Sequence, residues 1–172
     1  MPPSRDSPKI VIETARLRLA PLTAEDADEM AAVLGDEGLY EFIGGHLPTL
    51  AELRERYGRL AAGSPDPRMV WLNWIVRRRS DEEPLGTVQA TLTTKDGQSI
   101  AAVAWVIGVK WQGLGFASEA ARALVDWLRQ QGVQAVTANV HPDHRASAQV
   151  AARAGLRPTG ALAGGEQVWS WP

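Results

Sequence analysis

A glycine turn between an apolar run and a small-residue helix constrains this chain most. The apolar run is Val103–Val109, and Gly113 and Gly115 follow it, two residues apart. Glycine lets a backbone approach a ligand where a Cβ would collide. The first N–H groups of a helix have no intrahelical partner, and the helix dipole favours negative charge there. The turn therefore predicts a site for a ligand that carries phosphate.

Two nucleotide-binding interpretations of this turn are weakly supported. The dinucleotide fingerprint requires a third small residue and an acidic residue about 20 positions further on. Ser118 stands at the third position, and the next strand ends near Asn139 and His141. A phosphate loop of the nucleoside-triphosphatase type requires a lysine after the second glycine, and Phe116 stands there. A nicotinamide-dependent reductase is therefore a minor alternative.

The turn resembles a different signature, that of the GCN5-related N-acetyltransferase (GNAT) superfamily. Residues Gln112–Ala117 (QGLGFA) match its acetyl-CoA motif, Gln/Arg-x-x-Gly-x-Gly/Ala. Glu13–Leu19 (ETARLRL) near the start, and His144–Ser147 (HRAS) ahead of Ala154–Leu156 (AGL), are similar to the branch of ribosomal-protein N-terminal acetyltransferases. The motifs occur in the expected order, and the resemblance covers nearly the whole chain, from about Ile10 to Trp171.

The resemblance implies an α/β (α+β) fold: a central mixed, mostly antiparallel sheet with one splayed strand pair, flanked by helices. Apolar periodicity, capping residues and glycine stops predict a compatible order of elements. We expect strands near Lys9–Leu22, Met69–Val76, Leu85–Thr94, Ile100–Val109, Val133–Val140, Leu156–Leu162 and Glu166–Trp171, with helices near Ala24–Leu34, Thr49–Ala62, Ala117–Gly132 and His144–Ala154.

Composition narrows the class of protein. The 172 residues, 45% apolar and 22% charged, fit one domain, which we expect over residues 9–172 after a disordered lead-in at residues 1–8. A net charge of −2 does not favour nucleic acid as a partner. The absence of cysteine excludes disulfides and thiolate catalysis, and no apolar stretch is long enough for a membrane span. We therefore expect a cytoplasmic protein.

The charged residues of the sequence indicate neither a basic binding patch nor a metal site. Arg77–Arg79 with Asp81–Glu83 is typical of a solvated turn between strands. No cluster of His, Asp and Glu has the spacing of metal ligands, so we expect no metal.

The resemblance implies how acetyl-CoA would bind. Strands Ile100–Val109 and Val133–Val140 would splay apart, and the pantetheine arm would pair with the first of them like an added strand. Its pyrophosphate would lie on the N–H groups of Gln112–Ser118. The candidate cofactor-binding residues are Trp105, Ile107, Val109, Gln112, Gly113, Leu114, Gly115, Phe116, Ala117, Ser118, His144 and Ser147.

Catalytic candidates are less defined. Ser147 matches the serine of this branch and is a candidate acid or thiol-orienting hydroxyl; the alternative is a helix serine bonded to its own backbone. A backbone N–H near Ile107 or Val109 could hold the oxyanion. His144 stands where the family has a capping asparagine, so Asp143 could supply the cap instead.

The sequence does not single out one residue as the general base. Glu41, His46 and His141 are candidates, and direct attack by a neutral amine is equally acceptable.

The predicted function is transfer of an acetyl group from acetyl-CoA to a primary amine by direct attack in a ternary complex. The acceptor is a protein N-terminus or a small-molecule amine. The alternative is a non-catalytic acyl-CoA-binding module of the same fold, because the strand before the glycine turn lacks a titratable side chain. Without a long apolar stretch, we expect no membrane partner; the resemblance is compatible with a homodimer.

Overall fold

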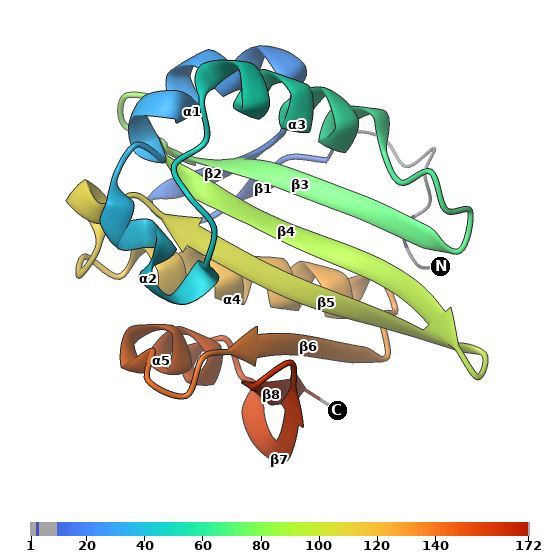
Figure 1. Ribbon diagram of the computed structural model, residues 1–172. Helices are drawn as coiled ribbons and strands as arrows, with labels where there is room; N and C mark the ends of the chain where they lie inside the picture. Colours follow the sequence, from blue (N-terminus) through green and yellow to red (C-terminus); the bar gives the residue numbers. More distant parts are fainter. Residues whose placement is uncertain (1–2, 4–9, 172) are drawn as a thin grey trace.

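A computed structural model describes residue 3 and residues 10–171. The predicted disordered lead-in at residues 1–8 lies, residue 3 aside, outside the described residues. Eight strands form one sheet in the order β1-β2-β3-β4-β5-β6-β8-β7 (Figure 1). Neighbouring strands run antiparallel except β5 and β6, which confirms the predicted mixed, mostly antiparallel sheet.

The elements follow the predicted order, with short 3-10 turns at Ala24–Asp26, Glu37–Leu39 and Val109–Trp111. The strands are β1 (Ile12–Glu13), β2 (Leu17–Pro21), β3 (Met69–Arg78), β4 (Pro84–Lys95), β5 (Gln98–Ile107), β6 (Ala135–Val140), β7 (Arg157–Ala163) and β8 (Glu166–Trp171); the α-helices are α1 (Ala27–Val33), α2 (Tyr40–Ile43), α3 (Leu50–Ala62), α4 (Phe116–Gln130) and α5 (Arg145–Arg153).

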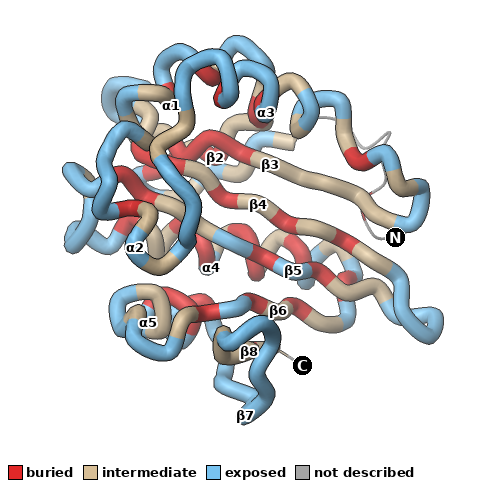
Figure 2. Tube along the Cα trace, in the orientation of Figure 1, coloured by how far each residue is buried: buried red, intermediate tan, exposed pale blue. Residues whose placement is uncertain are grey.

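Helices cover both faces of the sheet, with α4 on one face and α1 and α3 on the other (Figure 1). Strand side chains alternate between faces, so neighbouring residues of β3 enter different cores. Trp74 lies in the larger core with α4, where its ring meets that of Trp127 edge-on at 5.5 Å. Ile75 lies in a smaller core with α1 and α3. Figure 2 shows that buried segments lie along the central strands of the sheet.

Local signals in the sequence correctly mark several element boundaries. The Asp96-Gly97 turn joins β4 to β5, and both residues have positive φ, as a tight hairpin requires. The Thr49 hydroxyl accepts from the Glu52 N–H, and the Glu52 carboxylate accepts from the Thr49 N–H, so a capping box opens α3.

The strands β5 and β6 pair only near their N-terminal ends. Their parallel ladder joins Ile100–Ala102 to Ala135–Thr137 and then stops. Beyond it, β5 remains paired to β4 alone as far as Ile107. The predicted splayed strand pair is therefore confirmed, and we call the space between the diverging strands the slot.

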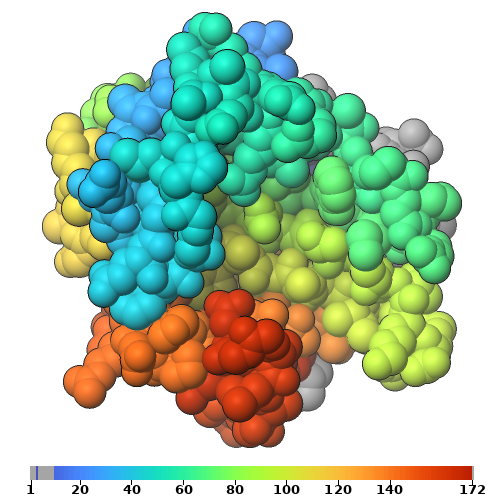
Figure 3. Space-filling view, in the orientation of Figure 1, coloured from blue at the N-terminus to red at the C-terminus, as the bar shows by residue number. Residues whose placement is uncertain are grey.

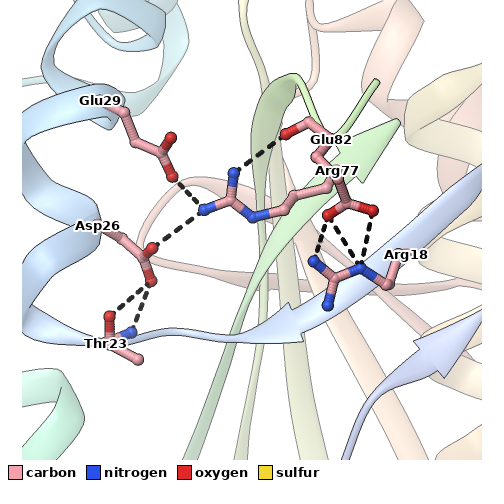
Figure 4. A network of polar contacts seen from close by, with 6 residues as sticks. All are labelled: Arg18, Thr23, Asp26, Glu29, Arg77 and Glu82. Carbon is pink, nitrogen blue, oxygen red and sulfur yellow. Dashed lines mark hydrogen bonds and ion pairs between the residues drawn. The ribbon is translucent and has the colours of Figure 1, made fainter. Parts of the chain in front are cut away.

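Two predictions, one about the end of β5 and one about the end of β3, are wrong. Val109 does not continue the strand, because β5 ends at Ile107 and Val109 begins a 3-10 turn. Arg77 does not lie in a solvated turn. Its side chain is 14% exposed, and its guanidinium bonds to Asp26 and Glu29 from the segment that opens α1 (Figure 4).

Candidate active site

The glycine turn presents a row of free backbone donors at the head of the slot. Gly113 and Gly115 have φ of 76° and 83°, and Gly115 is the N-cap of α4 without a side-chain cap. Within the described residues, the N–H groups of Gly113–Ser118 have no acceptor. The N–H of Gln112 is already bonded to the Val109 carbonyl, so the predicted donor row is shorter by one residue. These converging donors suit an anion.

Two residues near the start of the described chain, Thr14 and Arg16, hold this turn in place through hydrogen bonds. The Arg16 guanidinium donates to the Leu114 carbonyl (3.0 Å) and to the Glu119 carboxylate (2.7 Å), and lies 4.4 Å above the Phe116 ring. Thr14 donates to the same carboxylate (2.6 Å). Burial alone would raise the pKa of Glu119, but the bonds from Thr14 and Arg16 lower it overall. Glu119 is thus held as an anion in the first turn of α4, where the helix dipole favours it.

The edge of β5 that faces the slot has unpaired backbone groups. The Gly108 N–H donates to the Leu85 carbonyl on β4, whereas the Ser99 carbonyl accepts from the Gln134 N–H on the β6 side. Backbone groups alternate between the two sides of a strand. By this alternation, the groups that face the slot after β6 has diverged belong to Val103, Trp105 and Ile107.

The side chain of Gln112 lies at the C-terminal end of this edge. Its side-chain amide donates to the Ile107 carbonyl at 3.0 Å. Gln112 therefore ties the turn to the end of β5. Of the predicted strand contacts, Trp105 and Ile107 fit an added-strand arrangement, and Val109 does not.

Ser147 lies across the slot from β5, in the first turn of α5. Its Oγ accepts a hydrogen bond from the Trp105 indole N–H at 3.0 Å. The helix-backbone alternative for its hydroxyl is therefore not the arrangement that the structure shows. The N–H of Ser147 donates to Nδ1 of His144 at 3.3 Å, and His144 is the N-cap of α5. The expectation that Asp143 would cap the helix is wrong, because the imidazole does so.

Helix α2 brings an aromatic side chain onto this corner of the slot. The Phe42 ring stacks on His144 at 4.4 Å between centroids and lies 5.2 Å from the His141 ring. Burial lowers the pKa of His144, and nearby His141 lowers it further, whereas Glu41 opposes the shift. His144 is accordingly neutral at pH 7, and its Nδ1 carries the lone pair that the cap requires.

The base candidates are placed unequally. His141 and Glu41 both lie close to His144. His46 instead pairs with Glu52 at the start of α3 (3.5 Å), and its side chain is 79% exposed. The structure thus groups Glu41, His141, His144, Ser147 and Trp105 and leaves His46 apart.

The face of the sheet opposite α4 offers an open, uncharged surface beside the slot. Asn73, Gln89 and Ala104 lie opposite one another in the registers of β3, β4 and β5. Figure 3 shows a hollow floored by β4 and β5, between the α2–α3 segment and the C-terminal strands. The side-chain amides of Asn73 and Gln89 make no hydrogen bond to another described residue. An acceptor molecule could reach the slot from this side.

Several residues that build the site were not identified from sequence reasoning. Arg16, Glu119 and Phe42 are the main ones. Arg16 stands in the ETARLRL motif, and Glu119 stands in the first turn of a predicted helix, so both had a local signal. Phe42 had none, because its contact joins positions about a hundred residues apart.

The site fits an acyl-CoA ligand and offers no metal centre. A free donor row, an unpaired strand edge and a hydroxyl occur together, as a pyrophosphate, an amide-bearing arm and a sulfur require. In the part of the chain that the structure describes, no group of three His, Asp or Glu side chains could hold a metal ion. None of the described helices has the length and apolar character needed to cross a membrane.

Comparisons with known proteins agree with this geometry. A family model described as an acetyltransferase (GNAT) domain matches residues 16–157. No curated protein sequence matches significantly. A putative ribosomal-protein-serine acetyltransferase from Vibrio cholerae has 20% identity and a TM-score of 0.76, covering 95% of this chain and 98% of that one.

Two further solved structures have the same fold. The microcin C7 self-immunity acetyltransferase, in complex with acetyl-CoA and AMP, has 13% identity and a TM-score of 0.76, with coverage of 92% and 93%. An aminoglycoside acetyltransferase, in complex with coenzyme A and kanamycin, has 20% identity and a TM-score of 0.72, with coverage of 90% and 92%. The predicted family and fold are confirmed: the chain belongs to the GNAT family of acetyltransferases.

Proposed function

We propose that this enzyme transfers an acetyl group from acetyl-CoA to a primary amine, by direct attack while both substrates are bound. The observation that carries the proposal is the donor row of Gly113–Ser118 at the head of a slot with an unpaired strand edge. The donor row suits a pyrophosphate, and the edge suits the amides of a pantetheine arm. A site for an anion alone would not need the second feature.

The similar structures support the choice of ligand. One of them contains acetyl-CoA, and another contains coenzyme A with kanamycin, which bears amines. The hollow on the sheet face opposite α4 gives the acceptor a separate approach to the slot. We therefore expect a primary amine as acceptor, either a protein N-terminus or a small-molecule amine.

The residues of the slot have separate tasks in such a reaction. Acetyl-CoA supplies an acetyl group that is activated as a thioester. The Ile107 N–H, on the slot edge of β5, would stabilise the oxyanion. Ser147 offers a hydroxyl to the departing sulfur. Glu41 on α2 and nearby His141 can accept the surplus proton of the amine, directly or through water.

Release of free thiol tests the proposal. Acetyl-CoA is incubated with the protein and a peptide with a free N-terminus, a simple aromatic amine or kanamycin, and thiol is followed with a colorimetric reagent. Mass spectrometry of the acceptor then checks for one added acetyl group. Calorimetry with coenzyme A measures binding separately from turnover.

The three outcomes are distinct. Thiol release with an acetylated acceptor supports the enzyme. Coenzyme A binding without release with any amine supports the non-catalytic acyl-CoA-binding module. Absence of coenzyme A binding overturns both.

A further inference from the structure

A direct contact joins the two sides of the slot. The indole N–H of Trp105 on β5 donates to Oγ of Ser147 on α5 at 3.0 Å. The Trp105 ring is half-buried and packs against the larger core, so its position is fixed by other contacts. A hydrogen bond from a fixed ring also fixes the oxygen that accepts it.

The remaining bonds of Ser147 determine the direction in which its hydroxyl proton can point. A serine hydroxyl donates one hydrogen bond and accepts two. Oγ accepts from Trp105, and the Ser147 N–H is held by His144. Within the described residues the hydroxyl proton has no acceptor. It is therefore available to a ligand in the slot.

Without Trp105, the Ser147 hydroxyl could bond to the helix backbone instead. Serine in the first turns of a helix readily bonds to nearby backbone groups. An indole nitrogen carries a proton and cannot accept one, so its bond to Oγ admits only one polarity. The bond from Trp105 keeps Oγ at the slot and leaves the hydroxyl as the donor. Hydrogen bonds in series polarise one another, so the bond from Trp105 also strengthens the bond that the Ser147 hydroxyl donates.

We propose that Trp105 is a positioning residue that orients the Ser147 hydroxyl as a hydrogen-bond donor to the departing sulfur. This inference rests on the proposed acetyl transfer. As the carbon–nitrogen bond forms, the carbon–sulfur bond breaks and its electron pair goes to sulfur. Ser147 donates a hydrogen bond to that sulfur and keeps its proton. The surplus proton of the amine goes to water or to a neighbouring base.

A double-mutant cycle tests the coupling. Trp105→Phe removes the N–H and keeps most of the ring, and Ser147→Ala removes the hydroxyl. We expect each single change to lower kcat about tenfold, with a smaller change in KM for acetyl-CoA. In the Ser147→Ala background, Trp105→Phe should change kcat by less than about twofold, because its target is gone.

Trp171→Phe is the matched control. Trp171 packs against the same core from β8, and its indole N–H makes no hydrogen bond to another described residue. We expect this variant to retain kcat within about twofold. If the Trp105 and Ser147 changes multiply in kcat, or if Trp105→Phe changes only KM, the proposal is wrong.

A second readout does not depend on turnover. Indole N–H signals in a nitrogen-15 spectrum of the protein are assigned through the loss of one signal in Trp105→Phe. In Ser147→Ala, that signal should shift and exchange faster with solvent, while the Trp171 signal stays in place. An unchanged Trp105 signal would overturn the contact.

The two readouts also separate this inference from the proposed function. If no amine supports thiol release, the catalytic role of Trp105 fails together with the proposed function, whatever the spectrum shows. If the wild type releases thiol but the cycle shows no coupling, only the role of Trp105 fails.

Discussion

Two polar regions of this molecule treat their hydrogen-bonding groups in opposite ways. In the first, which we call the ionic corner, Arg77 bonds to Asp26, Glu29 and the Glu82 carbonyl, and Arg18 pairs with Glu82 (Figure 4). Every charge there has a partner within the chain. In the slot, the N–H groups of Gly113–Ser118 have none, and on the edge of β5 the Ile107 carbonyl is bonded only to the Gln112 side chain. The ionic corner stabilises the fold, and the slot leaves its partners to a ligand.

The difference shows which backbone groups the chain leaves available to a ligand. Backbone groups without partners are rare in folded proteins, because each one left unsatisfied costs free energy. The donor row of Gly113–Ser118 lies at the surface, where water can satisfy it until an anion replaces the water. Changes in the slot should therefore alter ligand affinity, and changes in the ionic corner should alter stability.

The largest effect is expected from Gly115→Val. At φ of 83° a β-branched residue is strained, and a Cβ would lie 3.3 Å from the Arg16 guanidinium. The donor row would shift, so we expect coenzyme A affinity to fall about 100-fold by calorimetry. The unfolding free energy should also fall, by about 1–2 kcal/mol.

Gly132→Val provides the control for backbone strain. Gly132 follows the other end of α4 with a φ of 82°, and a Cβ there meets nothing within 4 Å. It should lose similar stability and retain coenzyme A affinity. If both variants lose affinity equally, the donor row does not hold the cofactor.

Arg77→Met tests the opposite side of the comparison. The change keeps much of the side-chain length but removes the partner of Asp26, which is largely buried, and of Glu29, which is exposed. We expect a loss of about 2 kcal/mol in unfolding free energy by urea denaturation, with unchanged coenzyme A affinity. Arg59→Met, which removes an exposed pair with Glu55, should cost less than about 0.5 kcal/mol. Equal losses in the two variants would contradict the assignment.

The sequence predicted the slot better than it predicted the ionic corner, for a physical reason. The donor row depends on residues close together in the chain, so the local sequence around Gly113 and Gly115 is enough to predict it. The capping box of Thr49 and the Asp96-Gly97 turn are likewise local. Arg77 meets Asp26 about fifty residues away, and a run of charges gives no indication of such a partner.

The same reasoning explains the residues around Ser147. Ser147 was found through its motif, but its bond from Trp105 spans 42 positions and has no local pattern. His144 departs from the asparagine of the family motif, and only the structure shows that its ring serves as the cap. Phe42 has no sequence signal, because stacking between distant aromatic rings leaves no periodicity. Contacts across the fold were thus the part that the sequence could not supply.

Glu119 links the two kinds of region, because it is an ion-pair partner that supports the donor row. Its pKa is lowered, so the unfolded chain takes up its proton first as the solution becomes acidic. The stabilisation is fully present above the ordinary pKa of 4.5 and is lost as the pH falls through the folded value. Glu119→Gln should cost about 1 kcal/mol at pH 7, measured by denaturation. The difference from wild type should shrink below about pH 4.5; a constant difference would contradict it.

The smallest effect is expected from His144→Asn, which separates capping from titration. Asparagine is a good N-cap, so the start of α5 should persist. The pKa of His144 is lowered, so the unfolded chain binds its proton first as the pH falls below 6.5. Wild-type stability should decline there by well under 1 kcal/mol, because the ring is half-exposed, and the variant should decline less. Thermal unfolding at pH 7.5 and 5.5 measures this. A steeper decline in the variant would mean that protonated His144 is favoured in the folded state, so that its ring could not serve as the acceptor that caps α5.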